Sequence, residues 1–169
     1  MIEPIQVFPK EKGYGIISGQ RRIHAYVQLG KTSIPTVIEN VDEDTAVIKM
    51  VDSNLHRNLL TSERAFAYRM KLDVIMRKKG LPPLPEDQLE FTEQQEQAIH
   101  EIISSLFGEK AKQVEQYICL TYLYEKILPF VDAKKIEFSV AIELSYINVF
   151  AQWWFVGFSE QGLLSVTWG

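Results

Sequence analysis

Cysteine, long apolar runs and internal repeats are scarce or absent in this chain of 169 residues. Its one cysteine, Cys119, excludes an internal disulfide and suits a reducing compartment. No apolar run is long enough to cross a bilayer, and the opening Met1-Ile2-Glu3-Pro4 lacks the features of a signal peptide. The sequence therefore predicts a globular cytoplasmic protein with no membrane partner, and it excludes disulfide-rich secreted domains.

Positive charge is scarce in the second half of the chain. Residues 1–80 hold 13 Lys or Arg and 9 Asp or Glu, whereas residues 81–169 hold 5 and 13. The two halves thus carry net charges of +4 and −8. A polyanionic ligand should therefore prefer the first half.

Hydrophobic periodicity predicts an α+β first part, built from a hairpin, a helix, a third strand and two further helices. In the first of these helices, Ile23, Tyr26, Val27 and Leu29 are expected to face the core. The predicted elements are strands over 4–9 and 14–17, a helix over 20–29, a strand over 34–39, and helices over 42–54 and 61–79.

The second part of the chain has helical patterning only, after a proline-bearing stretch that we interpret as a linker over 81–91. Helices over 94–106 and 110–123, joined by a glycine-bearing turn, have the outline of a helix-turn-helix. Shorter helices are expected over 126–131 and 138–146. No clear period is visible over 148–169, where Trp153, Trp154, Phe155 and Phe158 either pack on the helices or form an exposed patch.

The most informative stretch runs from Tyr14 to Arg22, where a strand ends in Ser18-Gly19 and a helix begins at once. A helix N-terminus leaves backbone N–H groups free to bind an anion. Arg21 and Arg22 lie in the first helical turn, where the positive end of the helix dipole disfavours cations. The pattern predicts a phosphate site, although pairing of these arginines with Glu39 or Asp42 is an alternative.

Several motifs resemble the ParB family of chromosome and plasmid partition proteins. Residues 17–25, Ile-Ser-Gly-Gln-Arg-Arg-Ile-His-Ala, resemble its GERRxRA motif, and residues 53–57, Ser-Asn-Leu-His-Arg, fall where the family has ENIQR. Residues 62–68, 113–121 and 141–146 also look like the family. The resemblance extends from about Pro4 to Ile147, with an interruption in the linker.

This resemblance implies a ParB/sulfiredoxin-like nucleotide-binding domain over 1–80, a linker over 81–91 and an all-α helix-turn-helix domain over 92–147. Residues 148–169 then form a divergent aromatic tail. The implied protein binds double-stranded DNA during chromosome or plasmid partition, and CTP with Mg²⁺ switches a homodimer into a clamp. A ParA-like partition ATPase is an implied partner, and the implied location is the nucleoid or a plasmid in the cytoplasm.

The resemblance also implies which residues form the sites. The implied ligand of Mg²⁺ is Asn54, and the implied DNA contacts come from the recognition helix, at Lys110, Lys112, Gln113 and Gln116. The implied nucleotide and phosphate site is formed by Ser18, Gly19, Gln20, Arg21, Arg22, Asn54 and Arg57. Arginines and backbone amides suit phosphate, and an amide oxygen suits a hard cation.

Two departures from the family motifs bear on catalysis. Gln20 and Ser53 stand where the family has glutamates, so two carboxylates near the metal are lost. We expect nucleotide binding without efficient turnover, at most a weak CTP hydrolase, and we assign no catalytic residue. The segment that reaches the base before Pro4 and the C-terminal dimerisation region are expected to be missing, as in a chain shortened at both ends.

Other functions on the same sequence remain open. A kinase-like, nucleotide-using enzyme needs a carboxylate base, for which Asp52 is the candidate, and a transcriptional or adaptor protein needs only the helix-turn-helix. Sulfiredoxin-type thiol chemistry is disfavoured because no cysteine lies near Gln20, and Cys119 fits a buried, inert thiol. The three histidines, His24, His56 and His100, lack the spacing of metal ligands.

Overall fold

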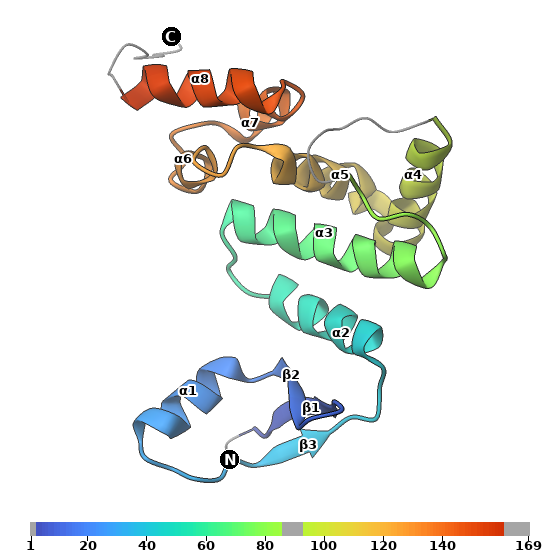
Figure 1. Ribbon diagram of the computed structural model, residues 1–169, viewed down its shortest axis with the longest axis vertical. Coiled ribbons are helices and arrows are strands. Elements are labelled where there is room, and N and C mark those ends of the chain that lie inside the picture. Colours follow the sequence, from blue (N-terminus) through green and yellow to red (C-terminus); the bar gives the residue numbers. More distant parts are fainter. Residues whose placement is uncertain (1–2, 86–92, 161–169) are drawn as a thin grey trace.

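The computed structural model describes residues 3–85 and 93–160. Its N-terminal part contains a three-stranded sheet (Figure 1). The strands β1 (Ile5–Pro9), β2 (Tyr14–Ser18) and β3 (Thr36–Ile38) lie in the order β2-β1-β3. β1 pairs antiparallel with β2 and parallel with β3. The predicted hairpin and third strand are therefore confirmed, and the fold class is α+β.

One face of the sheet is covered by α2 (Glu43–Leu55), which brings Ala46 against Phe8 and Ile17 in a small apolar core. The helix begins at Asp42, whose carboxylate accepts a hydrogen bond from the backbone N–H of Thr45 at 2.7 Å. This bond lowers the pKa of the Asp42 carboxyl below its ordinary value. Asp42 is thus the N-cap of α2.

The first helix, α1 (Gln20–Gln28), lies beside the sheet and buries none of its residues. Ile23 and Tyr26 are half-buried, but Val27 and Leu29 are 68% and 71% exposed. The expectation that Val27 and Leu29 face the core is wrong. The helix has its predicted start and end, but it does not bury the apolar face that its pattern predicts.

The long helix α3 (Thr61–Lys78) connects the sheet region with the helical part (Figure 1). Its Ala65 lies in one helical core, and its Leu72 and Met76 lie in a second one. On its other side it meets α2 through three ion pairs, Lys71–Asp52, Arg77–Asp44 and Lys78–Asp42. α3 therefore contributes to the helical cores although it precedes the predicted linker.

The helical part packs around α3. Its elements are α4 (Glu93–Phe107), a 3-10 turn (Gly108–Lys110), α5 (Ala111–Cys119), a second 3-10 turn (Leu120–Tyr122), α6 (Leu128–Asp132) and α7 (Phe138–Ser145). Asp132 at the end of α6 accepts a hydrogen bond from the backbone N–H of Ser62 at 2.9 Å and thereby caps α3. The predicted helix-turn-helix outline corresponds to α4, the first 3-10 turn and α5.

The first residues of the predicted linker are attached to the helical core. Leu84 is buried, and the guanidinium of Arg69 donates to the backbone oxygen of Pro85 at 2.7 Å. The backbone N–H of Leu84 donates to Asp73, whose pKa is raised because the carboxyl is partly buried. The rest of the predicted linker, residues 86–91, lies outside the described residues.

The aromatic tail contains a helix that the sequence did not predict, α8 (Val149–Glu160). The side chain of Gln152 in this helix is buried and forms three hydrogen bonds. It accepts from the Tyr124 N–H at 2.6 Å and donates to the carbonyls of Tyr122 and Ile147. Val156 and Phe155 also pack inward, whereas Phe150 and Trp153 are exposed. The side chain of Phe158 and residues 161–169 lie outside what the structure describes.

Candidate functional site

The junction between β2 and α1 requires glycine. Gly19 is buried and has φ = 102°, a conformation that L side chains rarely adopt. A Cβ atom on Gly19 would lie 2.6 Å from Cγ2 of Ile5 on the neighbouring strand. The chain can therefore turn directly from the sheet into α1 only because this position has no side chain.

This turn exposes the N-terminal end of α1. The N–H groups of Arg22 and Ile23 donate to the carbonyl of Gly19, at 2.9 and 3.1 Å. The N–H groups of Gln20 and Arg21 have no acceptor in the described parts of the chain. Two free amides at the positive end of a helix dipole form a local site for an anion.

The two arginines of this turn have different roles. Arg21 is exposed and makes no ion pair within residues 3–85 or 93–160. Arg22 is half-buried and donates to the backbone oxygens of Glu3 and Pro4, the latter at 2.6 Å. Of the two, Arg21 is the guanidinium available to a ligand, whereas Arg22 ties α1 to the start of β1.

The alternative that these arginines pair with Glu39 or Asp42 is wrong. Glu39 forms an ion pair with Lys49, and Asp42 accepts from Thr45 and pairs with Lys78 at 3.4 Å. Among the described residues, the positive charge of Arg21 therefore has no carboxylate partner. This supports an external anion as its ligand.

A hollow of about 400 Å³ runs along the exposed side of α1. It is lined by Gln20, Arg21, His24, Ala25 and Gln28. His24 and Gln28 were not predicted as site residues, although their spacing of four and eight residues from Gln20 places them on the same helical face. Ser18, which was predicted, points its hydroxyl to Gln6 Oε1 at 2.9 Å.

The second predicted group of site residues lies at the end of α2. Asn54 is half-buried in the last turn, and Arg57 follows the helix with an exposed side chain. The Arg57 N–H donates to the Asn54 carbonyl at 2.9 Å, and the hydroxyl of Ser53 donates to the carbonyl of Met50. In the part of the chain described here, no hydrogen bond joins this group to residues 19–22, so the structure presents them as two separate groups.

The candidate residues for kinase-like and thiol chemistry, Asp52 and Cys119, are poorly suited to those reactions. Asp52, the candidate base of a kinase-like enzyme, forms an ion pair with Lys71 at 2.6 Å. Burial raises the pKa of the Cys119 thiol, which favours the unreactive protonated form. Its contact with the Tyr146 hydroxyl, at 3.7 Å, raises the pKa of Tyr146 to about 12. Within the described residues, no group of three or more His, Cys, Asp or Glu could hold a metal ion.

The helix α5 presents a polar face away from the core. Ala111, Val114 and Ile118 are buried against α3 and α4. Lys112 and Gln113 are exposed and Gln116 is half-buried, while Lys110 is exposed in the preceding 3-10 turn. The four predicted DNA contacts therefore lie at or next to one exposed side of the second helix of a helix-turn-helix, as a recognition helix requires.

The first part of the chain is similar to a known protein family. Residues 1–55 match the model of the ParB N-terminal domain. Over these residues the chain is similar to the ParB family. The matched segment includes the Gly19 junction and extends through α2 to Leu55, whereas Arg57 lies beyond it.

The chain is also similar to several nucleoid occlusion proteins. The chain is 43% identical over 77 residues to that of Listeria monocytogenes serotype 4b and 38% identical over 76 residues to that of Halalkalibacterium halodurans. Each match covers 44% of this chain, but only 27% and 26% of the relative's length. The match thus spans about a quarter of each of these relatives.

One solved structure that matches this chain is that of the C-terminally truncated chromosome-partitioning protein ParB from Caulobacter crescentus, complexed to the centromeric parS site. It is 19% identical in sequence and superposes with a TM-score of 0.49. The match covers 96% of this chain and 78% of that one.

Residues 3–85 and 93–160 contain no helix long and apolar enough to cross a bilayer.

The junction analysis predicts that Gly19→Ala destabilises the protein more than Gly30→Ala. Both glycines have positive φ, but only Gly19 has neighbouring atoms within 4 Å of the added Cβ. Gly30→Ala should cost about 1–2 kcal/mol in the free energy of unfolding, from backbone strain. Gly19→Ala should cost about 1–3 kcal/mol more, from overpacking against Ile5.

Urea unfolding followed by circular dichroism measures both costs. Gly30→Ala is the matched control, since it changes the same atoms at the other end of α1. Equal losses in the two variants would show that the approach of Gly19 to Ile5 does not determine the junction.

Proposed function

We propose that this chain is a ParB-like DNA-binding protein with a CTP-type nucleotide site at the N-terminal end of α1. The observation that carries the proposal is the junction at Gly19, where two amides and the Arg21 guanidinium have no partner within residues 3–85 and 93–160. A triphosphate supplies the anion that this end of the helix lacks. The family match over residues 1–55 supports the same site.

Asn54 and Arg57 complete the proposed site from the end of α2. The exposed guanidinium of Arg57 suits the phosphates, and the amide oxygen of Asn54 suits Mg²⁺. The Mg²⁺ ion would neutralise charge on the triphosphate. Because the two groups are separate in this structure, we propose that nucleotide binding draws the end of α2 and the start of α1 together.

We propose binding without efficient turnover. Gln20 and Ser53 supply no carboxylate where the family has glutamates, and Asp52 is held by Lys71. A kinase-like reaction on this site would need that carboxylate as a base. The site therefore suits a switch that responds to nucleotide occupancy, such as closure of a homodimer into a clamp.

The second half of the proposed function is DNA binding through α5. Lys110 and Lys112 supply the positive charge, and Gln113 and Gln116 can reach base edges in the major groove. The net charge of −8 over residues 81–169 opposes binding to phosphate, so few basic contacts must suffice. A location on the nucleoid fits the nucleoid occlusion relatives, and partition with a ParA-like ATPase is the family's role.

A transcriptional or adaptor protein is the second candidate function. It uses α5 in the same way but needs no nucleotide. In the part of the chain that the structure describes, two amides and Arg21 at the start of α1 have no partner, which favours the nucleotide-dependent function over this one. A measurement of nucleotide binding therefore distinguishes the two candidate functions.

Titration calorimetry of the intact chain with CTP, ATP and GTP in the presence of Mg²⁺ tests the nucleotide site. We expect CTP to bind, and Arg21→Ala to weaken it about tenfold to a hundredfold, because a charge-assisted bond contributes about 1.5–3 kcal/mol. Lys12→Ala removes an exposed cation from the β1–β2 turn and should leave binding unchanged. No binding of any of the three nucleotides would refute the proposal.

Fluorescence anisotropy with a random-sequence duplex tests DNA binding through α5. The double variant Lys110→Ala/Lys112→Ala should lower affinity and reduce the slope of log K against log salt by about 2, since each phosphate contact contributes about 0.9. Lys134→Ala, in the turn after α6, is the control. Equal effects of the control and the double variant would show that α5 is not the DNA-binding element.

A further inference from the structure

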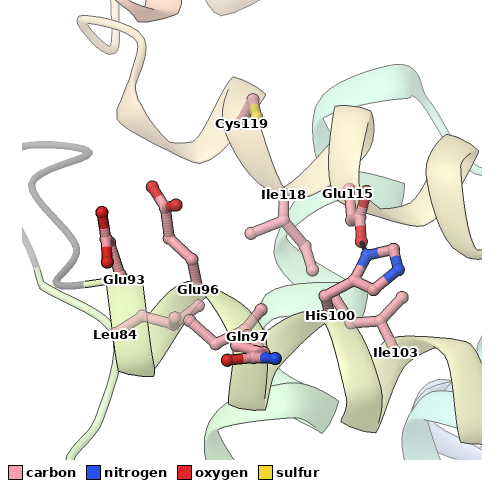
Figure 2. A pocket seen from close by; sticks show the side chains of 10 residues that line it. Leu84, Glu93, Glu96, Gln97, His100, Ile103, Glu115, Ile118 and Cys119 are labelled. Atoms are coloured by element: carbon pink, nitrogen blue, oxygen red, sulfur yellow. Dashed lines mark hydrogen bonds and ion pairs between the residues drawn. The ribbon is translucent and has the colours of Figure 1, made fainter.

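A second cavity lies between α4 and α5, far from α1 in the fold (Figures 1 and 2). Its volume is about 530 Å³, within the range of ligand-binding clefts. Leu84, in the segment that follows α3, also lines it. None of the nucleotide-site residues lines this cavity, and neither do the four proposed DNA contacts.

The floor of the cavity is apolar. Leu84, Ile103 and Ile118 are buried in the core beneath it, and the partly buried Ile99 belongs to the same cluster. Apolar side chains that line an open cleft gain free energy when another apolar group covers them, at about 25 cal/mol per Å². The occupant of the cavity should therefore bring a hydrophobic side chain.

The rim of the cavity is acidic. Figure 2 shows Glu93 and Glu96 rising from α4 toward the α5 side, and Glu115 on α5 accepting from His100 Nδ1 at 2.7 Å. Glu93 and Glu96 are exposed and form no ion pair among the residues that the structure describes. Two exposed carboxylates next to an apolar floor favour a cationic, amphipathic occupant.

We propose that the cavity between α4 and α5 is a docking site for a basic amphipathic peptide segment of a protein partner. One or two leucine-sized side chains of that segment cover the isoleucine floor, and flanking lysines or arginines pair with Glu93 and Glu96. A helix laid into an apolar groove between two helices is a common mode of peptide recognition. The negative charge of residues 81–169 attracts such a segment.

A free polyamine fits the same carboxylates less well. Exposed ion pairs contribute only about 0.2–1 kcal/mol each, so the carboxylates alone do not hold a small cation tightly. A linear amine has no branched side chain to cover Ile99, Ile103 and Ile118. The apolar floor therefore favours a peptide over a simple polycation.

The site is also placed to influence DNA binding. Glu115 and Cys119 line the cavity from α5, and Lys112 and Gln116 lie on the adjoining side of the same helix. A basic segment in the cavity would neutralise carboxylates that repel DNA phosphates. Occupancy should therefore strengthen DNA binding by the same helix.

The probe for this site is a fluorescein-labelled, 14-residue amphipathic helical peptide with leucines on one face and lysines on the other. Anisotropy with the intact chain should show saturable binding that weakens as salt is raised. The double variant Glu93→Gln/Glu96→Gln should weaken it about fivefold to tenfold, as expected for two exposed ion pairs. Ile99→Ala should weaken it as well, with folding of each variant verified by circular dichroism.

Glu101→Gln is the matched control, because Glu101 is an exposed carboxylate on α4 that does not line the cavity. It should bind the peptide as the unmodified chain does. The proposal is overturned if Glu101→Gln loses as much affinity as the double variant. It is also overturned if spermidine, or a peptide with serines in place of the leucines, binds equally well.

Discussion

The close approach of Gly19 to Ile5 determines where α1 begins and what its first turn exposes. Because no Cβ atom intervenes, β2 passes directly into α1, and the helix starts at the edge of the sheet. α1 buries none of its own residues, so its position depends on this junction and on the bonds from Arg22 to Glu3 and Pro4. The candidate anion site is thus a consequence of one backbone constraint.

The helix α3 connects this site with the proposed DNA-binding helix. It pairs with α2 through ionic contacts, and α2 carries Asn54 and Arg57 close to its far end. Its apolar side packs with α5 in one core and with the later helices in another. Exposed ion pairs are individually weak. Among the three cations of these pairs, Lys71 has the least exposed side chain. A shift at the end of α2 would therefore reach α5 through a single helix.

Much of this fold could be predicted from local patterns. The hairpin, the start of α1 after Gly19, the Asp42 cap and the paired helices α4 and α5 all follow from turn residues and apolar spacing. The helix α8 could not be predicted, because aromatic side chains lie on both of its sides and give no period of 3.6 residues. Its one buried amide, Gln152, is stable there only because three backbone groups of other segments bind it.

The site was predictable as a set of residues but not as an arrangement. Two adjacent arginines read alike in the sequence, yet they point about 100° apart around a helix, and only Arg21 remains available to a ligand. The apolar spacing predicts that Val27 and Leu29 are core residues, but both are exposed. The spacing does not show that α1 buries little of its surface against the sheet. The separation between Asn54 and the Gly19 junction also depends on how α2 packs, which no local pattern contains.

Hydrogen exchange measured by mass spectrometry, on the intact chain with and without CTP and Mg²⁺, tests the central claim most directly. If nucleotide occupies the free amides after Gly19 and draws in the end of α2, peptides covering residues 18–25 and 52–58 should exchange more slowly. Peptides from α7 and the described part of α8 should not change. No protection over residues 18–25, or protection confined to the helical part, would contradict the assignment of the site to the Gly19 junction.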